Sequence, residues 1–330
     1  MFPIYSLSPS DTSHGLKMMK TQTLEELENS PFKFFAVDNW TSLGVNNGAE
    51  LRAPNFWGFI NSIFFPTVMF YAILWYAVNT LVTMHCFTSF QEGIKRKRLI
   101  NLTTSLIHSS ISGIYLFTFF CLNTRLMFGS PLHYWTNLDS QIIILSIGYF
   151  IYDGFDLLVN DKISISTGVL LFHHVASIFV LSSSILSKKF LLYAYWALLM
   201  EVSSIFLHTR SILHISKLST TSMIGFSKVV AWFNLVAFIV FRFFVQVFLV
   251  GWAWVNLDNM HTMFAFIAFG GGCCFFIINV GLFLRILHSD GFLLSSVVSQ
   301  DRLDALLEDN EYSNSSENIA KSEKEELLDV

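Results

Sequence analysis

Seven stretches of mostly apolar residues alternate with short polar segments along the chain. A helix needs about 20 consecutive apolar residues to cross the hydrocarbon core of a bilayer, and each stretch meets or approaches that length. The pattern therefore predicts an all-α fold, a multipass transmembrane helical bundle of about seven spans. The stretches cover approximately residues 57–84, 99–121, 139–160, 167–187, 190–213, 224–255 and 262–287.

The polar segments divide the chain into four regions. Residues 1–55 form a polar N-terminal region, and residues 56–90 contain the first span. Residues 95–290 contain the other six spans. Residues 291–330 are acidic and rich in Ser and Asn, a composition typical of a disordered tail.

Basic residues between the spans predict the orientation in the membrane. Short cytosolic loops carry an excess of Lys and Arg, and the densest group is Lys95-Arg96-Lys97-Arg98 after the first span. This loop places the N-terminus outside or in the lumen and the acidic tail in the cytosol. The Lys188-Lys189 turn is discordant, because two lysines then fall outside. Asn39 begins a glycosylation sequon on the predicted lumenal side.

Composition narrows the possible partners. Hydrophobic residues make up 53% of the chain and charged residues 13%, against about 25% charged in soluble domains. The net charge of -4 comes without a basic face, so no nucleic acid is expected as a partner. The four cysteines have no zinc or disulfide spacing, and we predict neither a metal nor a cofactor.

Ionisable residues inside the apolar stretches are the strongest functional signal. Such groups are costly in a bilayer and usually mark functional sites. With a helical rise of about 1.5 Å per residue, most of them lie in the cytosolic half of the membrane. We therefore predict that they converge on a shared pocket open to the cytosolic leaflet. The residues are His108, Asp153, Asp156, His173, His174, Glu201 and His208.

Acyl transfer is the chemistry that these residue types suggest. His173 or His174 could act as a base or acyl acceptor, with Asp153 or Glu201 orienting the ring. The two histidines are about 100° apart on a helix, so we expect one to face the pocket and the other to bond a neighbouring helix. The alternative is that the same groups only form hydrogen bonds between helices.

Arg242, in the sixth stretch, needs a partner of its own. A lone membrane arginine requires an acidic or carbonyl partner, and Glu201 is the nearest acid in depth. We predict that Arg242 is a structural counter-ion, with a lipid phosphate as the other possible ligand. Together with Arg242, the candidate lipid-binding residues are His108, Asp156 and His208.

Four short runs resemble the signatures of one membrane family. They are Asn101–Ser109 (NLTTSLIHS), Gly148–Leu158 (GYFIYDGFDLL), Phe172–Val175 (FHHV) and Leu199–Arg210 (LMEVSSIFLHTR). Together they are similar to the TLC domain family, named for TRAM, Lag and CLN proteins. The resemblance covers about residues 95–290 and implies six TLC helices preceded by one additional span.

The last run is most similar to the branch that regulates plasma-membrane fluidity. This resemblance implies a regulator of phospholipid acyl composition that limits the incorporation of polyunsaturated, fluidising phospholipids. Its expected partners are membrane phospholipids or acyl chains and a lipid-remodelling enzyme. Three mechanisms stay open: a non-enzymatic regulator, an acyl-CoA-dependent acyltransferase, and a structural membrane protein.

Two features bear on these alternatives. The ceramide synthases of this family carry aspartates in the helix after the His pair, where this chain has Met200-Glu201 and Ser203-Ser204. This difference argues against ceramide synthesis and leaves other acyl transfers open. The resemblance and the dileucine-like Leu327-Leu328 favour the plasma membrane, with the endoplasmic reticulum as the alternative.

Overall fold

The computed structural model describes residues 48–90, 93–129, 131–160, 164–218 and 223–289. The predicted polar N-terminal region up to residue 47, with its sequon, and the tail from residue 290 lie outside the described residues. The chain divides into two units, Met1–Asn279 and Val280–Val330. Every contact discussed below lies within the first unit.

The described residues are helical and contain no β-strand. The α-helices are α3 (Phe64–His85), α4 (Ile94–Leu122), α5 (Thr124–Gly129), α6 (Ser140–Asn160), α7 (Ile165–Ser187), α8 (Leu191–Leu198), α9 (Glu201–Ile215), α10 (Ile224–Phe238), α11 (Val245–Val255), α12 (Thr262–Ala265) and α13 (Gly271–Ser289). Two π-helical segments, η4 (Ile239–Phe244) and η6 (Phe266–Gly270), connect α10 to α11 and α12 to α13. Short 3-10 helices are η2 (Ala49–Leu51), η3 (Phe56–Phe59) and η5 (Leu257–Asn259).

Seven helical stretches are long and apolar enough to cross a membrane. Three of them combine consecutive elements: α8 with α9, α10 through η4 to α11, and α12 through η6 to α13. The predicted all-α bundle with seven spans is therefore confirmed for the part of the chain that the structure describes. The sixth span is the longest, at 32 residues.

The first span begins later than the apolar pattern predicts. The stretch starts near residue 57, but α3 starts at Phe64 and is preceded by η3. Pro66 explains the difference, because proline lacks an N–H and clashes with the preceding turn inside a helix. In the first turn of α3, its missing N–H breaks no helical hydrogen bond.

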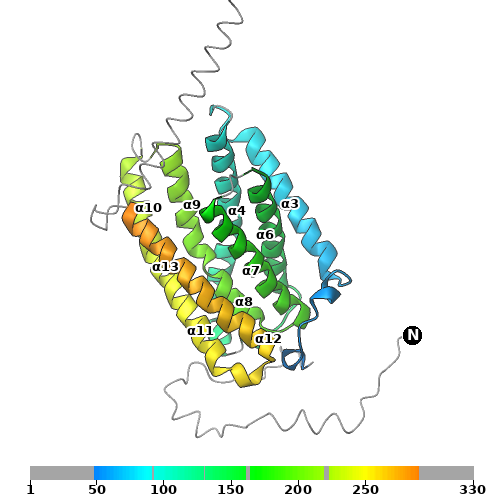
Figure 1. Ribbon diagram of the computed structural model, residues 1–330. Coiled ribbons are helices and arrows are strands. Elements are labelled where there is room, and N and C mark those ends of the chain that lie inside the picture. The colour runs from blue at the N-terminus through cyan, green and yellow to red at the C-terminus, as the bar shows by residue number, and fades with distance from the viewer. Residues whose placement is uncertain (1–47, 91–92, 130, 161–163, 219–222, 290–330) are drawn as a thin grey trace, which may run out of the picture. The chain divides into compact units, whose positions relative to one another are not determined.

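Neighbouring helices bring distant parts of the sequence together. α3 packs along α6, α6 along α7, and α4 and α10 both pack along α9 (Figure 1). α6 is the most enclosed span, with 67% of its apolar window buried. The helices that carry the candidate residues, α4, α6, α7 and α9, are therefore direct neighbours.

Glycine permits one close approach near the start of the last span. A Cβ atom at Gly272 would lie 2.8 Å from Val250 Cγ2 on α11. Gly272 is the last of three consecutive glycines, Gly270 to Gly272, and small residues of this kind allow helices to approach closely in membranes.

Candidate functional site

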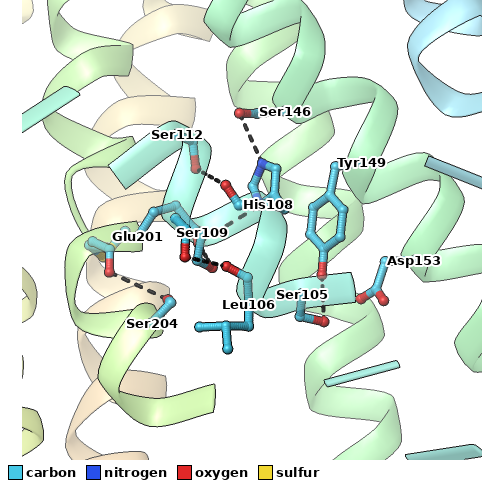
Figure 2. Close-up of polar contacts among 12 residues, drawn as sticks. Ser105, Leu106, His108, Ser109, Ser112, Ser146, Tyr149, Asp153, Glu201 and Ser204 are labelled. Carbon is cyan, nitrogen blue, oxygen red and sulfur yellow. Dashed lines mark hydrogen bonds and ion pairs between the residues drawn. The ribbon is translucent and has the colours of Figure 1, made fainter. Parts of the chain in front are cut away.

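One face of α4 carries most of the polar contacts in the interior of the bundle. Asn101, Ser105, His108 and Ser109 are spaced by four, three and one residues, so they share a face of the helix. Ser105, His108 and Ser109 are buried. Figure 2 shows Ser105, His108 and Ser109 between α4 and the helices carrying Tyr149, Asp153 and Glu201.

The first group of contacts, which we call the histidine–aspartate cluster, consists of Asn101, Asp153, Asp156 and His174. Asn101 Nδ2 donates one hydrogen bond to Asp153 Oδ1 at 2.8 Å and another to Asp156 Oδ2 at 2.9 Å. His174 Nε2 lies 3.4 Å from Asp153 Oδ2. Asp153 and His174 are both buried. The predicted meeting of a histidine from one span with an aspartate from another is therefore present.

The second group, the histidine–glutamate cluster, consists of His108, Ser109, Ser146 and Glu201. Ser109 Oγ donates to Glu201 Oε2 at 2.5 Å. His108 Nδ1 lies 3.9 Å from the same carboxylate oxygen, and His108 Nε2 lies 3.2 Å from Ser146 Oγ. Glu201 is therefore held by α4, whereas Asp153 faces both α4 and α7.

Hydrogen-bond direction excludes Ser146 as a serine activated by His108 in this arrangement. The only hydroxyl proton of Ser146 is donated to the Ile142 carbonyl at 2.9 Å. Ser146 Oγ must then accept from His108 Nε2–H, because a hydroxyl donates one hydrogen bond. In neutral His108 this arrangement leaves the lone pair on Nδ1, the atom facing Glu201.

Aromatic rings fix the position of His108. Its imidazole stacks on Tyr149 with a centroid distance of 3.9 Å and an interplanar angle of 7°. Trp75 contacts both rings edge-on, and Tyr149 donates to Ser105 Oγ at 2.8 Å. Such packing restricts the ring to one orientation.

The adjacent histidines diverge, as their spacing predicts. His174 turns towards Asp153 on α6, whereas His173 is partly exposed and packs edge-on against Phe275 at a centroid distance of 5.0 Å. His208 on α9 makes no side-chain hydrogen bond or ion pair with another described residue. The structure therefore favours His174 over His173 and His208 as a reactive group.

Arg242 makes no direct ion pair with Glu201, the acid nearest to it in predicted depth, although the Glu201 charge acts on it. Arg242 Nε donates to Ser203 Oγ at 2.8 Å, Nη2 to Ser204 Oγ at 3.0 Å and Nη1 to Asn279 Oδ1 at 3.0 Å. Within the described ranges, no carboxylate oxygen lies within ion-pair distance of this guanidinium. Arg242 thus links α9 to the last span through neutral oxygens, a group that we call the arginine cluster.

The arginine and histidine–glutamate clusters meet at Ser204, which accepts from Arg242 and hydrogen-bonds the Glu201 carboxylate (Figure 2). A cavity of about 20 Å³ lies elsewhere in the bundle, enough for about one water molecule. No residue of the three clusters lines it. Its lining residues come from α7, α8, α11, α12 and their connections, and include Ser183, Phe190, Tyr193, Trp252, Met260 and Phe264.

The histidine–aspartate cluster has the geometry of an oriented base. The Nε2 side of the His174 ring faces the Asp153 carboxylate, while His174 Nδ1 is buried and has no hydrogen-bond partner among the described residues. A carboxylate that holds one nitrogen of an imidazole leaves the other nitrogen available to take up a proton or an acyl group. In this arrangement, Nδ1 is the atom that can react.

Several site residues were missed from sequence. Asn101 was named only as the first residue of a family signature, yet it bridges two aspartates. Ser109, Ser146 and Asn279 were not singled out at all. The signal that could have found Asn101 and Ser109 is the helical spacing of Asn101, Ser105, His108 and Ser109 in an otherwise apolar span.

The fold and these clusters define a multipass α-helical membrane protein with ionisable groups buried between its spans. The family model described as the TLC domain matches residues 98–288. That range contains all three clusters, and the chain belongs to the TLC domain family. The resemblance inferred from four short runs is therefore confirmed.

Three relatives carry the same family name. "TLC domain-containing protein 2" of Danio rerio is 33% identical over 190 residues, covering 58% of this chain and 75% of the relative. "TLC domain-containing protein 2" of Homo sapiens is 31% identical over 173 residues, covering 52% and 62%. "TLC domain-containing protein 1" of Gallus gallus is 31% identical over 168 residues, covering 51% and 64%. The chain thus spans less than two thirds of the length of these last two relatives.

Proposed function

We propose that this protein regulates the acyl composition of membrane phospholipids and thereby the fluidity of the plasma membrane. The observation that carries the proposal is the His174–Asp153 pair, which lies inside a span and leaves His174 Nδ1 without a hydrogen-bond partner. A buried carboxylate beside an imidazole is expensive in a bilayer, and this cost favours a functional reason for keeping both.

Acyl transfer from acyl-CoA to a lysophospholipid is the mechanism that this geometry supports best. His174 Nδ1 would take the proton of the lysophospholipid hydroxyl as its oxygen attacks the thioester carbonyl. The acyl–oxygen bond forms, the carbon–sulfur bond breaks, and the proton passes from His174 to the departing thiolate. Asp153 would stabilise the imidazolium formed in between. Free CoA and a phospholipid are the products.

The deep burial of the clusters favours a second candidate, a non-enzymatic regulator. Asp153 and His174 are only 3% and 5% exposed, so a substrate would have to part the helices to reach them. A protein that binds an acyl chain or a lipid-remodelling enzyme needs no such access. In that case Arg242, His208, His108 and Asp156 would contribute to lipid binding.

A labelling assay separates the two candidates. Purified protein would receive radiolabelled acyl-CoA and lysophospholipid, and labelled phospholipid would be measured. Acyl transfer predicts product that falls at least about 100-fold in His174→Ala and Asp153→Asn, the lower range for loss of a general base. His85→Ala, which changes an exposed histidine at the end of α3, is the matched control and should retain full activity.

Cells lacking the protein give the complementary test. Re-expressed wild type should reduce the polyunsaturated fraction of plasma-membrane phospholipids. No labelled product from purified wild type, combined with rescue that requires His174, would support the non-enzymatic regulator. Full rescue by a well-folded His174→Ala and Asp153→Asn double variant would refute any role of this pair in the proposed function.

A further inference from the structure

Four segments meet at the end of the bundle that the sequence places outside the cytosol, here called the outer end. They are η2, the loop 131–139, the turn 187–190 and the loop 256–261. Two backbone hydrogen bonds tie them pairwise: Phe190 N–H donates to Leu132 O at 2.8 Å, and His261 N–H donates to Glu50 O at 2.6 Å. The segment before the first span is thus held against the loops between later spans.

A buried lysine lies at the centre of this junction. Lys189 is 0% exposed, although its sequence neighbour Lys188 is exposed. Lys189 Nζ lies 2.7 Å from His133 Nδ1 and 3.1 Å from Glu50 Oε2. His133 and Glu50 are themselves buried, so the three groups interact in a region of low dielectric.

The turn that carries Lys189 is built for this contact. Lys188 and Phe190 on either side adopt left-handed backbone angles, with φ of 52° and 59°. Left-handed non-glycine residues are uncommon and are kept only where surrounding contacts hold them. Ser184 Oγ donates to Lys189 O at 2.7 Å and supplies one such contact. The discordant Lys188-Lys189 turn is thereby explained, since one of its two charges is paired inside the protein.

Only a neutral His133 is compatible with this arrangement. The ammonium of Lys189 has donors and no acceptor, so His133 Nδ1 must accept its hydrogen bond. A proton on Nδ1 would remove that bond and bring two cations together. Burial and the charge of Lys189 lower the pKa of His133 to about 4, and Glu50 acts in the opposite direction.

The other ionisable groups at the junction are engaged elsewhere or exposed. On the loop of His133, the Asp139 carboxylate accepts from Tyr134, Thr136 and Tyr115. Arg52, which follows η2, and Lys188 in the turn are exposed. Asp258 is exposed, and His261 Nδ1 accepts from the backbone of Met263. Among the described residues, Lys189 and Glu50 are the charges that act on His133.

We propose that Glu50, Lys189 and His133 form an acid-sensitive latch, which holds the segment before the first span against the outer end and releases it when His133 is protonated. This device does not depend on the chemistry proposed for the histidine–aspartate cluster. It responds to the pH of the lumenal or extracellular side, the side on which the sequence predicts these residues.

The direction of the response follows from proton linkage. His133 binds a proton less readily in the latched state than in the released state, where its pKa returns towards the ordinary value of about 6.5. The latch is therefore at full strength above pH 6.5 and weakens as the pH falls towards about 4. The latched population, relative to the released one, falls about 80-fold between pH 6.5 and pH 4.

Release would also affect the cavity described above. Phe190 and Met260 line that cavity and are the sequence neighbours of Lys189 and His261. Since the latch ties the segments carrying these two residues to η2, opening it frees two walls of the cavity. The latch is thus coupled to an apolar space between α7, α8, α11 and α12.

Distance measurements between two spin labels test the latch. Leu51→Cys beside Glu50 and Leu138→Cys in the loop of His133 are both exposed attachment sites, at 52% and 79%. The labels would be introduced into the full-length protein in nanodiscs after replacing Cys86, Cys121, Cys273 and Cys274 with alanine. Double electron–electron resonance would then be recorded from pH 7.5 to pH 4.

The expected result is one narrow distance distribution at pH 7.5 that broadens and shifts to longer distances below pH 6.5. His133→Asn keeps an acceptor for Lys189 but cannot be protonated, so its distribution should stay narrow at every pH. Glu50→Gln should be broad already at pH 7.5. A wild-type distribution unchanged down to pH 4 would overturn the proposal, as would equal broadening in wild type and His133→Asn.

Discussion

The contact between α3 and α6 at Gly148 gives a quantitative test of the packing that positions the site. A Cβ atom at Gly148 would lie 2.6 Å from Tyr71 Cβ, 2.9 Å from Ala72 N and 3.0 Å from Tyr71 C. Carbon atoms pack best at about 3.5–4.0 Å. All three neighbouring atoms belong to the backbone or are fixed by it, so no side-chain rotation relieves the clash. Gly148→Ala should therefore force α3 and α6 apart by about 1 Å.

Such overpacking costs about 1–3 kcal/mol. Alanine recovers at most about 1 kcal/mol through its higher helix propensity. If this gain is realised in full, the net loss of unfolding free energy is about 0–2 kcal/mol, and the loss relative to a glycine-to-alanine change without a clash is about 1–3 kcal/mol. Because Trp75 Nε1 donates to Leu145 O at 3.2 Å across the same contact, this bond and the stack of His108 on Tyr149 should loosen together.

Gly168→Ala in α7 is the matched control, because a Cβ atom there meets nothing within 4 Å. It should leave stability unchanged or raise it by up to about 1 kcal/mol. Both variants would be purified in one detergent, and their unfolding midpoints would be compared by size-exclusion chromatography after heating. Equal midpoints for Gly148→Ala and Gly168→Ala would refute the reasoning, since only helix propensity would then matter.

Three further substitutions probe the polar groups. Arg242→Lys should lower the unfolding free energy by about 1–3 kcal/mol in the same assay, because one ammonium cannot reach the three acceptors of a planar guanidinium. Asn101→Asp places a third carboxylate against Asp153 and Asp156. At pH 7 it should lower the unfolding midpoint more than the uncharged Asn101→Leu does. Equal midpoints for the two variants would show that the aspartates are solvated and would contradict this prediction. Since the folded-state pKa of His133 is lowered to about 4, wild type should lose at most about 3 kcal/mol as the pH falls from 6.5 to 4. His133→Asn should flatten that pH profile of the unfolding midpoint.

The fold could be predicted because it depends mainly on the lengths and positions of apolar stretches along the chain. Apolar length predicts the spans, and the helical rise predicts depth, so the meeting of Asp153 with His174 could be expected from their similar distance to the cytosolic ends. The error at the start of α3 came from reading hydropathy without the effect of Pro66 on a helix interior.

The partner of Arg242 could not be predicted because depth does not give the rotation of a helix. Glu201 is only two residues from Ser203, but two residues correspond to about 200° around a helix. Glu201 therefore bonds Ser109 on α4, while Ser203 bonds Arg242. Which face of α9 turns towards which neighbour depends on the packing of the whole bundle. Because α9 carries polar residues on more than one face, its sequence is compatible with more than one rotation of the helix.

The burial of Lys189 could not be predicted for a related reason. The positive-inside rule counts charges in loops and assumes that they are exposed, but this lysine is buried against His133 and Glu50. Glu50 belongs to a segment more than a hundred residues earlier, and no local pattern links the two. Hydropathy also gives no indication that Lys188 and Phe190 in this turn adopt left-handed backbone angles.

The position of Asn101 bears on whether the buried polar groups are only structural. A structural hydrogen bond between α4 and α6 needs one carboxylate, yet the amide of Asn101 donates to both Asp153 and Asp156. Both amide hydrogens are then used, and Asp153 keeps its second oxygen, Oδ2, directed towards His174. The second aspartate adds a cost in the bilayer without joining a third helix, because among the described residues its other bond is to Asn160 on its own helix. Its effect is to hold the amide, and through the amide the Asp153 carboxylate, in one orientation. That arrangement is expected of a group that positions a reactive imidazole, and it makes Asn101 the residue on which the acyl-transfer hypothesis depends most after His174 and Asp153.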